Sequence, residues 1–303
     1  MYKFYKLTLV IAGVLLWNTI TFGQVTTSSI EGLVRDTDNE PLPGITVMAI
    51  HEPSGTQYGV ATREDGRYNL PNVRVGGPYS ITVSGVGFKT KTQEEIFLSL
   101  GQSTRLDFVL ESENVQLKEI VISGEKDELL SAERTGAATS VSTKQLESLP
   151  TIARSAQDFT RLTPQSSGNS FGGRNVLYNN FSLDGSIFNN SFGLDAPTPG
   201  GQTNAQPVSL DAIEQIQVSL APYDVRQSGF TGAGVNAVTK SGSNEVSGSI
   251  YTFTRNENFI GEKIGNTTVT NPNLSYNQSG FRIGGPIMEN TMFFFANAEI
   301  ERR

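Results

Sequence analysis

Few residues in this sequence could act as a nucleophile, a general base or a metal ligand. The 303 residues include no Cys and one His, His51. A catalytic nucleophile needs an adjacent base, and a zinc site needs several His, Cys or carboxylate ligands. A lone His supplies neither, and the carboxylates are scattered. We therefore predict that the chain is not an enzyme and binds no cofactor.

The segment Asp36-Thr37-Asp38-Asn39-Glu40 is the strongest candidate for a metal site. Carboxylates at alternate positions suit a hard cation such as Ca²⁺. The segment lacks the Gly that an EF-hand loop needs at its sixth position. Asp and Asn are also typical of tight turns. We favour a solvated hairpin turn and predict no metal site.

A second group of side chains could recognise a ligand without catalysis. The stretch between Gly172 and Gly201 is rich in Asn, Gly and Phe. Side-chain amides offer neutral donors and acceptors, and Phe offers a stacking surface. Plain turn chemistry is the alternative, because Asn and Gly tolerate left-handed backbone. The candidate ligand-facing residues are Asn179, Asn180, Phe188, Asn189, Asn190 and Phe192.

A short β-prone run, 117–123, could bind another protein through its main chain. Its apolar core is Ile120-Val121-Ile122, and a charged stretch follows it. An extended segment can add to the exposed sheet edge of a partner by main-chain hydrogen bonds. The alternative is an ordinary strand of the domain that follows.

Charge and the first residues limit where the protein acts. The net charge is −7 and no basic stripe occurs, which argues against nucleic acid. Lys3 and Lys6 precede an apolar run from Leu7 to Trp17, and small residues follow as far as Gly23. This order is typical of a signal peptide, 1–23, and the run is shorter than the ~20 residues that span a bilayer. We predict export, with any membrane insertion by strands; an N-terminal anchor is the alternative.

The elements that must position these residues are mostly short strands. Alternating apolar residues bounded by turns predict a β-sandwich of about 80 residues. The apolar positions are Ile30, Gly32, Val34; Ile45, Val47, Ala49; Tyr79, Ile81, Val83; and Leu106, Phe108, Leu110. Gly32-x-Val34-x-Asp36, Pro41-Leu42-Pro43-Gly44 and Asp65-Gly66-x-Tyr68 then resemble the carboxypeptidase-regulatory-like family. That resemblance implies a transthyretin-like Greek-key domain, 24–111, which is accessory and not catalytic.

The middle of the chain mixes helix and strand signals. We expect strands at 139–141, 216–218 and 234–240. Ser142 or Thr143 should begin a helix that ends before Pro150, and Ser209 should cap a helix from Leu210 to Glu214. A second helix, 155–162, should place three apolar residues on one face: Ala156, Phe159 and Leu162.

The last 60 residues alternate as strands of about 10 residues do in transmembrane barrels. The strands are expected at 246–255, 280–287 and 292–301, with an outward loop between the first two and a tight turn at Glu289-Asn290. Tyr251 and Phe253 should share one face of the first strand, and Phe281 and Ile283 should point away from Arg282.

Several strings in the middle of the chain resemble the plug of TonB-dependent outer-membrane receptors. They are Phe181-Ser182-Leu183-Asp184-Gly185, Pro222-Tyr223-Asp224-Val225-Arg226 and Asn236-Ala237-Val238-Thr239-Lys240-Ser241-Gly242. The last two are similar to the Oar-like and SusC-like branch. The resemblance implies a chain that is mainly β with some α: the sandwich, an α+β plug at 116–242, and at 243–303 the first strands of an incomplete transmembrane β-barrel.

Membership of this family implies further roles and partners. A linker, 112–136, would carry the contact for TonB and its inner-membrane energising complex at Glu119, Ile120, Val121, Ile122 and Ser123. The plug would gate uptake of an unknown ligand (a peptide, a glycan or a chelate), and a surface lipoprotein is a candidate partner. Three strands cannot close a barrel, so we expect a fragment or a truncated product. The alternative function is a secreted binding or adhesion module that uses the sandwich without transport.

Overall fold

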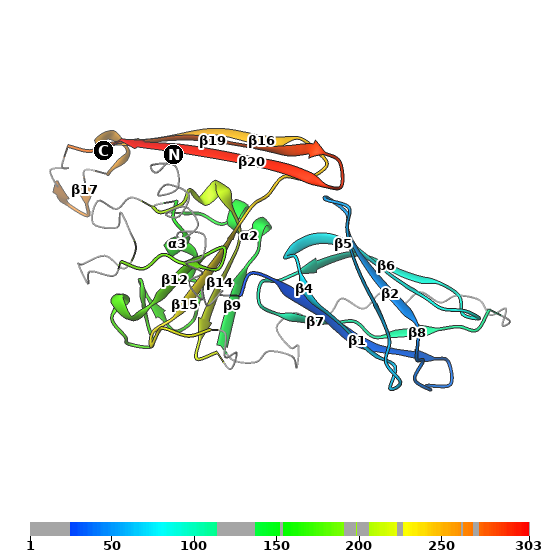
Figure 1. The fold of residues 1–303 in the computed structure, drawn as a ribbon. Helices are drawn as coiled ribbons and strands as arrows, with labels where there is room; N and C mark the ends of the chain where they lie inside the picture. Colours follow the sequence, from blue (N-terminus) through cyan, green and yellow to red (C-terminus); the bar gives the residue numbers. More distant parts are fainter. Residues whose placement is uncertain are drawn as a thin grey trace, which may run out of the picture.

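The computed structural model divides the chain into three parts, shown in Figure 1. It describes residues 25–113, 137–151, 154–190, 198, 206–222, 227–261, 263–268 and 273–302. The predicted signal peptide, the predicted TonB contact at 119–123 and Phe192 lie outside the described residues.

The first part is a sandwich of two four-stranded sheets. In the first sheet β1 pairs with β4 on one side and, in parallel, with β7 and β8. The second sheet is antiparallel, in the order β3-β2-β5-β6. The strands are β1 (Ser28–Asp36), β2 (Thr46–His51), β3 (Thr56–Ala61), β4 (Arg67–Val73), β5 (Gly76–Ser84), β6 (Lys91–Leu98), β7 (Ser103–Arg105) and β8 (Phe108–Leu110).

The alternating residues of both sheets meet in one apolar core. Ile30, Val34, Val47, Ala49 and Ile81 are all fully buried there. Each such aliphatic side chain contributes about 1.5–3 kcal/mol of transfer free energy when buried. The predicted sandwich pattern is therefore confirmed at the level of strands and core.

The second part, the central domain (residues 137–240), is built on a five-stranded mixed sheet in the order β13-β12-β15-β14-β9. Its strands are β9 (Ala137–Val141), β12 (Asn180–Leu183), β13 (Ser186–Ile187), β14 (Ile213–Leu220) and β15 (Gly234–Thr239). Smaller elements are α2 (Thr143–Ser148), α3 (Ala156–Thr160), β10 (Ser166–Ser167), β11 (Ser170–Phe171), and the 3₁₀ turns η2 (Val176–Tyr178) and η4 (Leu210–Ala212).

The first helix of the central domain forms where the sequence predicts it. The backbone N–H of Ser142 donates to the Gln145 side chain over 3.0 Å, and Pro150 follows the end of α2. A capping bond of this kind satisfies a backbone amide that the first turn of a helix leaves without a partner.

Two other predicted helices are wrong in extent. α3 ends at Thr160, so Leu162 leaves the buried face that Ala156 and Phe159 share and is 45% exposed. The predicted helix from Leu210 to Glu214 is a single 3₁₀ turn. Strand β14 begins at Ile213, because main-chain pairing with β9 and β15 on both sides outweighs the local helix signal.

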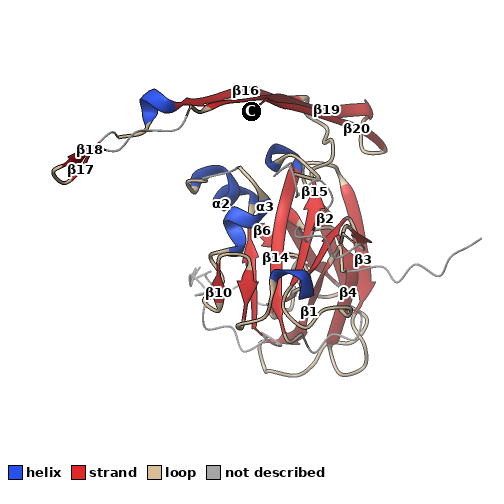
Figure 2. Cartoon of the chain, turned by 90° about the vertical axis from the view of Figure 1, so that its left-hand side faces the viewer, coloured by secondary structure: helices blue, strands red, loops and turns tan. Residues whose placement is uncertain are grey.

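The third part is the terminal sheet, which consists of β16 (Ser247–Asn256), β19 (Ser275–Met288) and β20 (Met292–Arg302). The strands form an antiparallel meander. The sheet lies over the central domain in Figure 1, and Figure 2 shows it as a separate layer. η5 (Glu257–Phe259), β17 (Lys263–Ile264) and β18 (Thr267–Thr268) lie between β16 and β19. β19 begins at Ser275, earlier than predicted.

The turn between β19 and β20 is tight, as predicted. Asn290 adopts a φ of 58° there, in the left-handed region that Asn tolerates better than most residues. Among the helices that the structure describes, none combines the length and the apolar character that a membrane crossing requires.

Candidate functional site

The two faces of the terminal sheet differ in chemistry. The face turned away from the central domain carries apolar side chains in alternate positions, including Ile250, which is 88% exposed. The other face carries Ser249, Tyr251 and Arg282, which are partly covered. The predicted alternation of the three strands is confirmed, with Phe281 and Ile283 exposed on the face opposite Arg282.

Four charged residues join the central domain to the inner face of this sheet, and we call them the ionic cluster. The Arg282 Nε atom lies 3.3 Å from Asp211 Oδ1, and its Nη2 atom lies 3.7 Å from Glu147 Oε1. Lys240 Nζ lies 3.2 Å from the same Glu147 oxygen. Lys240 is only 8% exposed, so this contact is less screened by solvent than an ordinary surface pair.

The elements of the fold bring these four residues together from distant positions. Glu147 lies near the end of α2, Asp211 lies in η4, and Lys240 follows β15 directly. The backbone N–H of Lys240 donates to the carbonyl of Ala212 over 2.7 Å, which fixes two of the cluster's segments to each other. Arg282 is the only member from the terminal sheet.

Hydrogen bonds of neutral side chains surround the ionic cluster. Ser249 donates a hydrogen bond to Asp211 and accepts one from Arg282 Nε over 3.1 Å. Ser209 donates to Asn297 over 3.0 Å, so the η4 region is bound to β20 as well.

Arg154 adds a cation–π contact between the same two parts. Its guanidinium carbon lies 4.7 Å from the ring centre of Tyr251 and 4.0 Å from that of Phe253. Such contacts contribute about 0.5–1 kcal/mol at exposed sites and more when desolvated.

Two cavities flank the ionic cluster and share Glu147 and Lys240 as lining residues. Their volumes are about 190 Å³ and 250 Å³. A water molecule occupies ~30 Å³ in the liquid, so each cavity has room for several. Since the lining carries charges of both signs, this interface is polar and open to hydration, unlike the apolar core of the central domain.

The predicted ligand-facing amides are used for bonds within the central domain. Asn179 accepts from the Ala233 N–H over 3.0 Å and donates to the Asn169 carbonyl over 2.8 Å. Asn189 donates to Asn180 Oδ1 over 2.8 Å and accepts from a backbone N–H. Asn180 is buried. These three side chains thus connect loops of the central domain, and all three also line one cavity of about 40 Å³, so their contact with a ligand stays a prediction.

The two remaining predicted ligand-facing residues that the structure describes are Phe188 and Asn190. Phe188 packs against the core of the central domain, and Asn190 is partly exposed. The most exposed large side chain nearby is Tyr178, at 57%, followed by Ile187 and Leu177. The sequence analysis missed them. The sequence pattern that could have identified them is the Asn-x-x-Tyr turn. In it, Asn175 Oδ1 accepts from the Leu177 N–H over 2.9 Å.

The remaining titratable candidates have structural roles. Asp36 Oδ1 accepts the backbone N–H groups of Asp38 and Glu40 over 2.9 and 2.8 Å, as expected for a turn. His51 Nδ1 is 2.6 Å from Ser54 Oγ, and burial, then the nearby Arg74 charge, lower the pKa of His51 to about 4. Across the described ranges, no group of three or more His, Asp or Glu could hold a metal ion.

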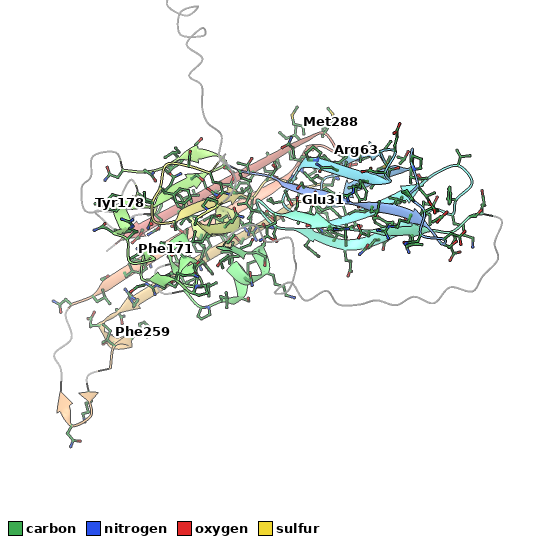
Figure 3. All side chains as sticks on the ribbon, turned by 90° about the horizontal axis from the view of Figure 1, so that it is seen from below. Glu31, Arg63, Phe171, Tyr178, Phe259 and Met288 are labelled. Carbon is green, nitrogen blue, oxygen red and sulfur yellow. The ribbon has the colours of Figure 1, made fainter. Side chains whose placement is uncertain are left out.

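The short turn of the terminal sheet and the exposed surface around Tyr178 lie toward opposite ends of the terminal strands. In Figure 3 Met288, at the short turn, lies on the side of the sandwich residues Glu31 and Arg63. Tyr178 and Phe259 lie toward the other end. The short turn and the sandwich therefore share one end of the molecule, and the exposed Tyr178 surface lies toward the end with the long connection.

Comparison with known families agrees with this arrangement. Residues 29–111 match the carboxypeptidase regulatory-like domain, and residues 238–303 match the outer membrane beta barrel domain. A carboxypeptidase regulatory-like domain followed by part of an outer membrane beta barrel domain supports the resemblance to outer-membrane receptors that the sequence indicated.

The similarity to individual proteins narrows the class. The chain is 27% identical, over 95% of its length, to the TonB-dependent transporter Oar of Myxococcus xanthus, and it spans 28% of that relative's length. Oar and the two domain matches support a TonB-dependent receptor in the outer membrane.

Two solved structures match parts of this chain at low identity and low TM-score. The siderophore receptor PirA of Acinetobacter baumannii matches with a TM-score of 0.41 and 22% identity, covering 55% of this chain and 24% of that one. A 3-chlorocatechol 1,2-dioxygenase from Rhodococcus opacus matches with a TM-score of 0.24 and 12% identity, covering 30% of this chain and 61% of that one.

Proposed function

We propose that this chain is the N-terminal portion of a TonB-dependent receptor whose central domain is a plug that gates ligand uptake. The observation that carries this proposal is the two-faced terminal sheet. Its outer face is apolar, as a strand wall requires against lipid, and its inner face binds the central domain through the ionic cluster. In this assignment the plug comprises residues 116–242, and the barrel begins at 243.

A polar interface suits a plug that must move. Ion pairs that are partly solvated lose little when water replaces the partner, whereas exposing an apolar core costs about 25 cal/mol per Å². Glu147 is itself half exposed, so the ionic cluster can rehydrate as it opens. The plug can therefore leave the wall without first losing its own core.

The orientation follows from the loop lengths. Barrels of the outer membrane have short turns on the periplasmic side and long loops outside. The turn at Asn290 and the sandwich would then face the periplasm, and the Tyr178 surface would face the exterior. We propose that the ligand contacts Leu177, Tyr178 and Ile187, and that Asn179, Asn180 and Asn189 hold those loops in place.

The TonB contact is proposed at Glu119, Ile120, Val121, Ile122 and Ser123. An extended apolar segment of this kind can add a strand to a partner's sheet, with the energising complex supplying the force. The imported ligand would be a peptide, a glycan or a chelate, and a surface lipoprotein could assist its capture.

Cysteine cross-linking in cells tests the proposal. The 303 residues contain no Cys, so Ile120→Cys introduces the one thiol of this part of the receptor, and any Cys beyond residue 303 is replaced by Ser in the full-length protein. We expect the receptor in the outer-membrane fraction, and a disulfide between this residue and a cysteine introduced in TonB. Val109→Cys, on an exposed sandwich position, is the matched control and should not cross-link. A soluble product would overturn the proposal and favour the adhesion alternative.

A further inference from the structure

A buried side chain of the central domain, Gln215 of β14, binds the main chain of the sandwich. Gln215 Oε1 accepts the backbone N–H of Leu100 over 2.9 Å, and its Nε2 donates to the carbonyl of Leu98 over 3.0 Å. Gln215 is 4% exposed, so water does not compete for these two bonds. One side chain of the central domain thus satisfies two backbone groups of the sandwich.

The main chain of the sandwich also approaches the central sheet very closely at this point. Gly101 has a φ of +67°, and a Cβ atom there would lie 2.8 Å from the amide atoms of Gln217. Leu100 is fully buried but belongs to neither hydrophobic core. Its burial comes from the interface between the two domains, where Gln215 binds its N–H. We call these contacts the plug interface of the sandwich.

A second interface joins the sandwich to the terminal sheet. The Asn244 N–H donates to the Pro53 carbonyl over 2.8 Å. Within the terminal part, the Asn244 side chain donates to Asn290 Oδ1 and accepts the Asn290 backbone N–H, each over 2.8 Å, and so holds Asn244 against the short turn. The bond that crosses to the sandwich joins two partly exposed residues, Asn244 and Pro53, so water can replace either partner. We call this set the wall interface.

The two interfaces differ in what is lost when they open. Opening the plug interface leaves the Leu98 carbonyl, the Leu100 N–H and the Gln215 amide to be rehydrated together with an apolar side chain. Opening the wall interface exchanges the main-chain bond between Asn244 and Pro53, which are partly exposed, for bonds to water. The plug interface is therefore the more costly of the two to open.

From this difference we infer that the sandwich and the plug form one unit, and that the sandwich leaves the wall together with the plug. This inference rests on the proposed function for the movement of the plug. The order in which the two interfaces open does not depend on TonB. The sandwich then stays bound to the plug throughout. The contacts that break when the two leave the wall are the bond between Pro53 and Asn244 and the bonds of Arg282 in the ionic cluster.

Hydrogen exchange on the full-length receptor in lipid nanodiscs tests the order of opening. Two backbone amides report the two interfaces separately: Leu100 N–H for the plug interface and Asn244 N–H for the wall interface. In urea below the unfolding transition, we expect Asn244 to exchange at least about tenfold faster than Leu100. Equal rates, or faster exchange at Leu100, would overturn the inference.

Two variants connect the protection of Leu100 to Gln215. Gln215→Met keeps the side-chain volume but removes both hydrogen bonds, and it should raise exchange at Leu100 about tenfold or more. Ser219→Ala, four residues further along β14, is the control and should change it less than twofold. Unchanged exchange at Leu100 in Gln215→Met would also overturn the inference. Neither exchange measurement uses TonB. A failure of this inference can therefore be distinguished from a failure of the proposed function, which the TonB cross-link tests.

Discussion

The sandwich and the central domain bury their sheets in different ways. Both inner faces of the sandwich are apolar and meet in one continuous core. The central sheet has one apolar face, with Ile216 and Val218, and one face that is buried although it is polar. The polar face carries Asn180, Ser182, Gln215, Gln217, Ser219 and Asn236.

Not all polar atoms on that face are satisfied. Ser182 donates to Asn236 Oδ1 over 2.5 Å, but Asn236 Nδ2 and Gln217 Oε1 have no hydrogen-bond partner among the residues that the structure describes. A buried polar group without a partner costs about 1–3 kcal/mol. The comparison indicates a stable accessory domain next to a central domain with little stability to spare, which suits a part that has to be displaced.

The largest expected effect comes from deleting core volume in both domains. Ile81→Ala in the sandwich and Ile216→Ala in the central sheet remove fully buried side chains, and each should cost about 2–5 kcal/mol. The sandwich should survive this loss, whereas the central domain should become sensitive to protease at ambient temperature. Limited proteolysis of the full-length receptor measures both. Equal sensitivity of the two variants would contradict the comparison.

The difference between the domains also explains what the sequence could predict. Ile45, Val47 and Ala49 alternate in the sequence and are buried in the sandwich, because one sheet face meets one core. In β14 both faces are buried, so Gln215 and Gln217 look like solvent-facing residues in an alternating pattern. Their role depends on the sandwich, which is more than 100 residues away in sequence.

The candidate site was predictable only in part, for the same reason. The sequence placed Arg282 on the face opposite Phe281 and Ile283, but its partners Glu147 and Asp211 come from two other elements. The ligand-facing role of the Asn-rich stretch stays a prediction. Whether an amide faces a ligand or holds a loop depends on contacts such as that of Asn179 with Ala233, which no local pattern encodes.

The next effect is a pH dependence confined to the sandwich. Burial and the Arg74 charge lower the pKa of His51 from 6.5 to about 4 in the folded state. Above pH 6.5 His51 is neutral in both states and has no effect. As the pH falls from 6.5 to 4, only the unfolded state binds the proton, so the sandwich should lose up to about 3 kcal/mol of stability.

Urea unfolding of the sandwich at pH 7 and pH 4 measures this loss. His51→Gln removes the titrating group while retaining a polar partner for Ser54. The difference between the two pH values should shrink by most of the His51 contribution in that variant. An unchanged pH dependence in His51→Gln would show that other groups carry it.

A smaller effect is expected at the interface between the central domain and the terminal sheet. Arg282→Met removes both ion pairs and the bond to Ser249 while keeping a long side chain. Since Glu147 is half exposed, we expect a cost of about 1–2 kcal/mol, less than for a fully buried pair. Exchange at the Lys240 amide, measured in the full-length receptor, should rise, while Leu100 stays protected.

The smallest effect tests the polar face of the central sheet directly and has the opposite sign. Gln217 is buried and its carbonyl oxygen has no partner, so Gln217→Met exchanges an unsatisfied polar group for an apolar one of similar volume. We expect the central domain to gain about 1 kcal/mol. The variant should resist protease longer than the wild type does. A loss of stability would mean that the Gln217 amide supports the approach of Gly101, and the polar face would then be a requirement of sandwich binding.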